Sequence, residues 1–346
     1  MKRIAAILLS ALMVLSLAAC DGAEASSAAS SGSASQESQS SSESQSASAS
    51  GEMLKIGVIQ LMEHDSLDQA YQGFVDGLAE AGYVDGENIT IDYQNAQGEQ
   101  ANCQTIAEKL VADQSDLVLA IATPAAQAMA NATTEIPILV TAVTDPADAK
   151  LVESNEHPGG NVTGTSDLTP VAEQIQLLKD LVPDAQTVGL LYNSGEANSQ
   201  FQMDLARAAC EELGLETLDL TVSSTNEIQQ VVESAIGKVD VLYTPSDNVI
   251  ASAVPNVVMV SDPAGIPFIV GVEAMVETGG LATYGINYYN LGKLTATQAV
   301  DILEGKSVPA DMPIQYLSDC TLVIDQEKAA ALGITIPQEL LDQLAG

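Results

Sequence analysis

Several short apolar runs in this sequence end in small polar residues, which could bind a small charged molecule. Thr123 follows the run 117–121, and Thr144 follows the run that begins at Ile138. A proline directly after Thr123 suits the first turn of a helix, and it leaves neighbouring N–H groups free beside the threonine hydroxyl. Free N–H groups at a helix N-terminus attract a carboxylate. The first half of the chain therefore offers a candidate carboxylate site.

Acidic residues end two apolar runs in the second half. Asp247 comes after the run 239–243, and Glu273 comes after the run 267–270. Either carboxylate could pair with an ammonium group. Purely structural roles are the alternative for all of these positions. Hydroxyl and carboxylate side chains cap helices, and Asp favours turns beside proline.

The candidate ligand-binding residues share this position at the ends of apolar runs or at junctions between the two halves. His64, one of two histidines, belongs to the loop after the first run, where a surface or capping role is the alternative. The full candidate set is Gln60, His64, Thr123, Thr144, Asp145, Ser166, Asn193, Ser246, Asp247, Glu273 and Asn287.

Strand-like runs alternate with amphipathic helical stretches along the chain, and this alternation predicts an α/β fold. Repeated strand–helix units build doubly wound parallel sheets with helices on both faces. The pattern restarts after a break near 164–169, which predicts two similar lobes. Ligands of open α/β sheets bind at the carboxyl ends of the strands. We therefore expect two such edges to face each other across a cleft.

Motifs of catalysis and cofactor binding are absent from the sequence. It contains no GxGxxG after a strand, no GxxxxGK[ST] and no GxSxG. No CxxC or His–Cys spacing predicts a metal site, and no cofactor is expected. Beyond Cys20 the odd set of Cys103, Cys210 and Cys320 is not a disulfide framework, although one pair with one free thiol stays open. Cys103 falls in register with apolar helix positions, which predicts a small buried side chain.

The N-terminus resembles an export signal followed by a tether. Two basic residues precede an apolar run that is too short for an ordinary membrane-spanning helix. This run ends in Leu-Ala-Ala-Cys20, which resembles a bacterial lipobox and predicts a signal peptide over 1–19 and lipid on Cys20. The Ser-rich segment 20–52 lacks large apolar side chains, and we expect it to be a disordered linker.

The charge of the chain excludes one class of partner. The net charge is −36, with 47 acidic and 11 basic residues. Nucleic acids require a basic binding face, so we expect no nucleic-acid partner.

A set of short motifs is similar to the ABC-type substrate-binding lipoproteins that include tryptophan- and tyrosine-binding members. The resemblance covers about 54–345 and is specific only as a set. The motifs are IGVIQ at 56–60, HDSLD at 64–68, GF at 73–74, AIATPAA at 120–126, VTDP at 143–146, NVTG at 161–164, GLLYN at 189–193 and GITIP at 333–337.

This resemblance implies a type I periplasmic-binding-protein fold with a three-segment hinge. Lobe one would span 53–165 and 287–306, and lobe two 166–286 and 307–346. Related binders of amino acids hold the ligand carboxylate at the third and fourth strand ends, here Thr123 and Thr144. They hold the ammonium with an acidic residue after a late strand of lobe two. Glu273 is the best match here, with Asp247 as its rival or partner. His64 would cover the ligand side chain.

We therefore expect a non-enzymatic lipoprotein that hands an amino acid, with aromatic ones among the candidates, to an ABC permease. It would act as a monomer, anchored on the outer face of the cytoplasmic membrane. The chain has no Trp and only 3% aromatic residues, so Tyr, His or Met would have to pack an aromatic ligand. A sensory module of the same fold and a doubly wound enzyme are the alternatives. A nucleobase, a sugar or a peptide could replace the amino acid.

Overall fold

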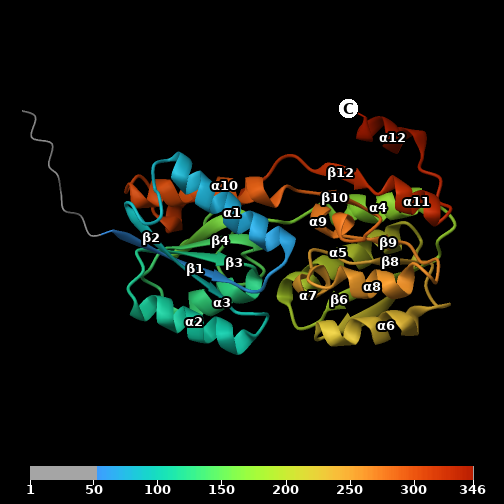
Figure 1. The fold of residues 1–346 in the computed structure, drawn as a ribbon, viewed down its shortest axis with the longest axis horizontal. Coiled ribbons are helices and arrows are strands. Elements are labelled where there is room, and N and C mark those ends of the chain that lie inside the picture. Colours follow the sequence, from blue (N-terminus) through green and yellow to red (C-terminus); the bar gives the residue numbers. More distant parts are fainter. Residues whose placement is uncertain (1–52, 346) are drawn as a thin grey trace, which may run out of the picture. The chain divides into compact units, whose positions relative to one another are not determined.

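The computed structural model describes residues 53–345, which contain two six-stranded sheets (Figure 1). The expected signal peptide, Cys20 and linker lie outside the described residues. The expected α/β fold with two parallel-sheet lobes is confirmed. Within 53–345, none of the helices combines the length and hydropathy that a membrane crossing needs.

The sheet of the first lobe is entirely parallel, and it carries helices on both faces. Its order is β11 (Gln315–Tyr316), β5 (Val162–Ser166), β4 (Ile138–Val143), β3 (Leu117–Ile121), β1 (Leu54–Gln60) and β2 (Ile89–Asn95). One face carries α1 (Asp65–Glu80) and α10 (Tyr288–Leu303), and the other α2 (Gln100–Ala112) and α3 (Thr123–Ala132) (Figure 1). Strands β3 and β4 are buried along their whole length, as their continuous apolar runs predict.

The sheet of the second lobe repeats this design with one antiparallel edge. Its order is β12 (Thr321–Ile324), β10 (Ala282–Gly285), β9 (Phe268–Ile269), β8 (Val241–Tyr243), β6 (Thr187–Asn193) and β7 (Glu216–Val222), and only β12 runs antiparallel. The helices of this lobe are α4 (Val171–Leu181), α5 (Ala197–Glu212), α6 (Ile228–Ala235), α7 (Asn248–Ala251), α8 (Val254–Ser261), α9 (Glu273–Glu277), α11 (Gln326–Ala331) and α12 (Gln338–Leu344). Short 3₁₀ turns lie at Thr225–Glu227 and Pro309–Asp311.

The described chain crosses between the sheets three times: after β5, after β10 and after β11. The sequence expectation placed 307–346 in the second lobe, and this is wrong for β11. Tyr316 pairs with Ser166 in parallel register at the edge of the first sheet. The Thr163 hydroxyl also donates to the Met312 carbonyl over 2.6 Å, which fastens this segment to β5. The last crossing therefore lies between β11 and β12.

Two glycines let α10 pack directly on α1. A Cβ on Gly73 would lie 1.9 Å from the Tyr289 carbonyl oxygen, and one on Gly292 would lie 2.0 Å from the Ala70 carbonyl oxygen. No larger side chain fits at such backbone contacts. This close approach fixes the start of α10, and with it Tyr288, relative to the start of α1.

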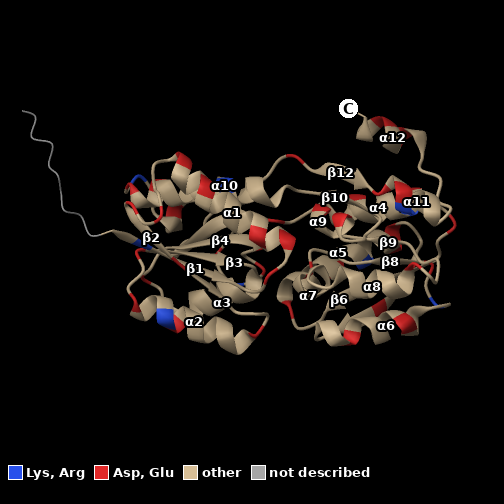
Figure 2. Ribbon diagram, viewed as in Figure 1, with Lys and Arg blue, Asp and Glu red and all other residues tan. Residues whose placement is uncertain are grey.

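Acidic side chains are spread over both lobes, whereas lysine and arginine are few (Figure 2). The basic residues that are present mostly pair with acids at the surface, as Lys109 does with Asp92 and Asp113 and Arg207 does with Asp219. Exposed pairs of this kind contribute little to stability. The described surface therefore offers no broad basic face to a polyanion.

Candidate functional site

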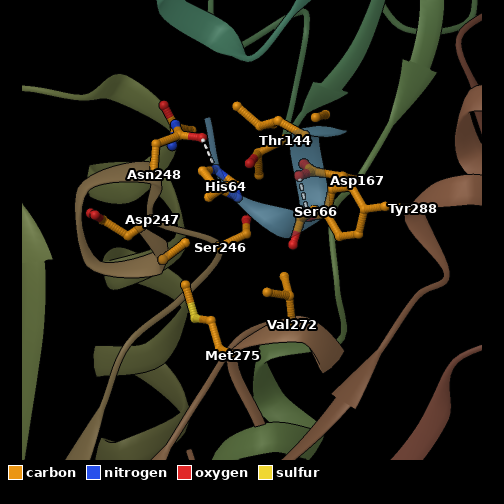
Figure 3. Close-up of a pocket in the computed structure, with 14 residues that line it drawn as sticks. His64, Ser66, Thr144, Asp167, Ser246, Asp247, Asn248, Val272, Met275 and Tyr288 are labelled. Carbon is orange, nitrogen blue, oxygen red and sulfur yellow. Dashed lines mark hydrogen bonds between the residues drawn. The ribbon is translucent and has the colours of Figure 1, made fainter. Parts of the chain in front are cut away.

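A narrow cavity lies where the carboxyl edges of the two sheets meet (Figure 3). The cavity volume is about 10 Å³, which is room for about one water molecule. The two lobes are therefore in close contact. The lining side chains come from both lobes and, through Asp167, from the first crossing: His64, Ser66, Leu67, Ala142, Thr144, Asp167, Asn198, Ser246, Asp247, Asn248, Ala251, Val272, Met275 and Tyr288.

Two hydrogen bonds join the lobes directly at this cavity. The Nε2 of His64 lies 3.3 Å from the Oδ1 of Asn248, and the Nε2 of Gln202 donates to the Thr144 hydroxyl over 3.2 Å. Burial lowers the pKa of His64, although its bond to Asn248 acts in the opposite direction. A neutral imidazole that donates from Nε2 keeps Nδ1 as an acceptor. The structure is thus a closed form with a neutral histidine between the lobes.

Glu196 fixes the orientation of Asn248. The Nδ2 of Asn248 donates to this carboxylate, so its Oδ1 is left to face His64. Asn198 and Asn193 donate to the same carboxylate over 3.2 and 3.1 Å. Burial, with a smaller effect of the Asp247 charge, raises the pKa of Glu196 to about 7. An acid that was not a sequence candidate therefore organises this side of the cavity.

Asp247 uses its carboxylate oxygens within the second lobe. The N–H of Ile250 donates to Oδ1 over 2.9 Å, which caps α7. The N–H of Asn193 and the Ser199 hydroxyl donate to Oδ2 over 2.6 and 2.7 Å. Burial raises the pKa of Asp247, whereas these hydrogen bonds lower it. The residue lines the cavity, but its hydrogen bonds already hold the strand ends of β6 and β8 together.

Asp167 lies in the first crossing and contacts Tyr288, which begins α10 after the second crossing. The Tyr288 hydroxyl donates to Oδ2 of Asp167 over 2.6 Å (Figure 3). The carboxyl is 4% exposed and makes no salt bridge with any residue in 53–345. Burial raises the pKa of Asp167, and bonds from Tyr288 and Thr144 partly offset this. No hydrogen bond of normal geometry reaches Oδ1.

Of the sequence candidates, His64, Thr144, Ser246 and Asp247 come together at the cavity. The others are not among its lining residues. Gln60 donates to the Met62 carbonyl and to Asp68, and so shapes the loop before α1. Thr123 is buried at the start of α3.

Several further candidates do not line the cavity but form hydrogen bonds or helix ends close to the residues that do. The Ser166 hydroxyl donates to the Thr144 carbonyl over 2.6 Å, and Asn287 caps α10 by accepting from the N–H of Asn290. Asp145 accepts two backbone N–H groups of its own turn. Glu273 begins α9 half-buried, and burial raises its pKa. These groups position backbone segments that carry the lining side chains.

Sequence reasoning missed several lining residues, chiefly Asp167, Asn248, Met275 and Tyr288. Asp167 directly follows β5, so it could have been chosen for the same reason as Ser166, namely its position at the end of a strand. Asn248 could have been found as the neighbour of Asp247 at another strand end. No sequence signal distinguishes Met275 or Tyr288 from ordinary packing residues.

A family described as ABC transporter substrate binding protein matches residues 55–345. The chain belongs to this family. The expected importer function and the absence of an enzymatic role are thereby confirmed, because the family comprises substrate-binding proteins of transporters. The sensory and enzymatic alternatives are not favoured. Members of this family act outside the cytoplasm.

Close relatives of this substrate-binding protein bind aromatic amino acids. It is 44% identical over 285 residues to a tyrosine-binding protein of Clostridioides difficile, covering 82% of each chain. It is 43% identical to a Streptococcus pneumoniae ABC domain in complex with L-Trp, covering 84% of this chain and 98% of that one, with a TM-score of 0.82. More distant sugar-binding structures, such as a glucose-galactose binding protein of Geobacillus stearothermophilus at 15% identity, share only the fold.

A comparison with an open relative identifies the conformation of this substrate-binding protein. A Clostridium difficile substrate-binding protein with adhesive properties, in its ligand-free, open structure, is 44% identical over 82% of this chain and 96% of that one. Its TM-score is 0.64, against 0.82 for the L-Trp complex at almost the same identity. The closed arrangement seen at the cavity therefore matches the ligand-bound relative better.

Proposed function

We propose that this substrate-binding protein captures an aromatic L-amino acid between its lobes and delivers it to an ABC permease. The observation that carries this proposal is the cavity itself, where both lobes and the first hinge crossing contribute side chains. Relatives that are 43–44% identical bind tyrosine or contain bound L-Trp, which supports the same ligand class here.

Apolar groups at the cavity suit an aromatic side chain. Met275 and Val272 supply apolar surface, and His64 supplies a polar edge (Figure 3). Leu67 adds further apolar surface to the lining. Methionine sulfur makes favourable contacts with aromatic rings. These residues therefore compensate for the absence of Trp from the chain.

Closure of the lobes provides the binding mechanism. The cavity is too narrow for an amino acid as described, so the His64–Asn248 and Thr144–Gln202 bonds must open for entry. A ligand that contacts both lobes would take the place of these two bonds and favour closure of the lobes around it. The permease would recognise that closed form.

Thermal unfolding of residues 51–346, which form one compact unit, tests the ligand class. A ligand at 100 times its Kd stabilises the folded state by about 2.7 kcal/mol, which raises the Tm by several degrees. We expect L-tyrosine or L-tryptophan to produce this shift, with the D-enantiomers as controls. A shift with nucleobases or sugars but with none of the twenty amino acids would contradict the proposal.

Lipid on Cys20 would hold this protein on the outer face of the cytoplasmic membrane as a monomer. The lipobox-like sequence supports the anchor, and a site built from a single chain supports the monomer. In cells fed labelled palmitate, we expect the full chain to incorporate the label and Cys20→Ser to lose it. Equal labelling of the two would exclude Cys20 as the anchor.

A further inference from the structure

Three buried polar side-chain atoms of the cavity have no hydrogen-bond partner among residues 53–345. They are the Ser66 hydroxyl, on a residue 2% exposed, the Oδ1 of Asp167 and the Oδ1 of Asn198. A buried polar group without a partner costs free energy, and a buried charge costs more. In native structures such a group commonly marks a bound water or ion, or a functional site.

A third unpartnered atom at this cavity, the Oδ1 of Asn198, has an explanation within the protein. Its amide lies against Glu196, whose raised pKa favours the protonated form. A protonated Glu196 is a donor, and an amide flip brings Oδ1 of Asn198 to it. The Ser66 hydroxyl and the Oδ1 of Asp167 have no hydrogen-bond partner of normal geometry among the described residues, although Thr144 lies close enough to the Asp167 carboxyl to lower its pKa.

Asp167 lacks a cation. Tyr288 binds one carboxylate oxygen, and no lysine, arginine or histidine of the described chain pairs with the other. A buried carboxylate is stabilised chiefly by a cationic partner that also donates hydrogen bonds. An α-ammonium group has three N–H donors and one positive charge, and it fits the free oxygen.

Ser66 lies in the first turn of α1, a helix of 16 residues whose N-cap, His64, makes no side-chain capping bond. The N–H groups of that turn therefore have no capping side chain. A helix N-terminus carries partial positive charge and favours an anion. With the unpartnered Ser66 hydroxyl beside it, this end of α1 suits a carboxylate.

We propose that Asp167 receives the α-ammonium group of the ligand and that Ser66, with the first-turn amides of α1, receives the α-carboxylate. This assignment rests on the proposed amino-acid function, and it differs from the roles expected from the sequence. Glu273 and Thr123 do not line the cavity, and the oxygens of Asp247 are occupied. Tyr288 is a positioning residue that holds the Asp167 carboxyl.

Calorimetry with matched ligands tests the ammonium assignment. L-tyrosine is compared with 3-(4-hydroxyphenyl)propionate, which lacks the ammonium, and L-tryptophan with indole-3-propionate. We expect the wild type to prefer the amino acid by about 100-fold, and Asp167→Asn to reduce that preference to a few-fold, as for truncation of a buried charge pair. The exposed Glu277→Gln on α9 is the matched carboxylate-to-amide control and should keep the wild-type preference.

Tyramine and tryptamine, which lack the carboxylate, test Ser66 in the same way. Ser66→Ala should lower the preference for the amino acid over the amine by about 5- to 10-fold, because the backbone amides of α1 remain. The preference for the amino acid over the propionate should not change in this variant. An unchanged preference over the amine would remove Ser66 from the site.

Two outcomes separate this inference from the proposed function. If the wild type binds none of these amino acids, the proposed function fails. If the wild type binds them but Asp167→Asn keeps the full ammonium preference, or Glu273→Gln is the variant that loses it, the present assignment is wrong. Should Asp167→Asn fail to fold by circular dichroism, Tyr288→Phe replaces it. This variant should weaken L-tyrosine binding by about 10-fold and leave the propionate unchanged.

Discussion

His64 of the first lobe and Asn248 of the second lobe meet across the cavity, with 3.3 Å between Nε2 and Oδ1. The bond exists only when the lobes are closed, because its two residues lie at the ends of strands in different sheets. The Asn248 amide also donates a hydrogen bond to Glu196, which fixes its orientation. One neutral hydrogen bond thus helps to set the balance between the open and closed forms.

Replacement of Asn248 by Ala should favour the open form. The loss of one neutral hydrogen bond weakens closure by about 1 kcal/mol, which corresponds to about a five-fold loss of ligand affinity. Small-angle scattering of the ligand-free variant should give a larger radius of gyration than the wild type. Asn198→Ala removes another donor from Glu196 without touching His64, and its radius of gyration should stay at the wild-type value. Equal radii for all three proteins would show that this bond does not control closure.

Glu196 should make stability depend on pH. Its pKa is about 7 in the folded protein against an ordinary 4.5, so the folded state holds a proton that the unfolded state has lost. The free energy of unfolding therefore falls as pH rises from about 4.5 to 7, by at most about 1.4 kcal/mol per pH unit from this group. Glu196→Gln should flatten this part of the curve in urea titrations at several pH values. A wild-type slope in the Gln variant would assign the dependence to other groups.

Gly73 should not tolerate a methyl group. An alanine Cβ would collide with the Tyr289 carbonyl on α10, and overpacking of this kind costs about 1–3 kcal/mol. Urea unfolding should show this loss for Gly73→Ala. Gly160→Ala, where a Cβ meets nothing within 4 Å, is the control and should be nearly neutral. A neutral Gly73→Ala would mean that α1 and α10 separate easily.

Thiol labelling should distinguish the three cysteines of the folded body. Burial raises the pKa of both Cys103 and Cys210 to about 11, whereas Cys320 is exposed in the last crossing. Native residues 51–346 should therefore react quickly at one thiol and, after unfolding, at three. Cys320→Ser should abolish the fast reaction. Fast labelling that persists in this variant would place another thiol at the surface.

The regular elements could be predicted because their apolar runs are long and periodic. The apolar pattern of the sequence predicts strands at 54–60 and 117–121 and a helix over 171–181, and the structure has all three with these bounds. The same kind of pattern predicts one helix over 249–260, but this stretch forms α7 and α8. Pro255, in the first turn of α8, has no N–H to continue the preceding helix. The local apolar pattern therefore determines most of the elements, and Pro255 accounts for the break between α7 and α8.

The site was predictable in place but not in detail. His64 and Thr144 could be predicted because both follow predicted strands, and ligands of open α/β sheets bind at the carboxyl ends of the strands. Glu273 was chosen as a strand-end acid, whereas in the structure it begins α9 outside the lining. The pairing of Asp167 with Tyr288 joins residues 121 positions apart, and no sequence period encodes such a contact. Only its tertiary contacts, which the sequence does not reveal, distinguish Asp167 as a cavity residue from the other acidic residues.

The late position of α10 and β11 in the chain determines when the first lobe can be completed. Both belong to the first lobe, yet they are made near the end of the chain. A partly synthesised chain therefore lacks the helix that covers α1, and its apolar face stays uncovered until about residue 303 has emerged. We therefore expect the first lobe to complete its fold only after most of the chain has been made.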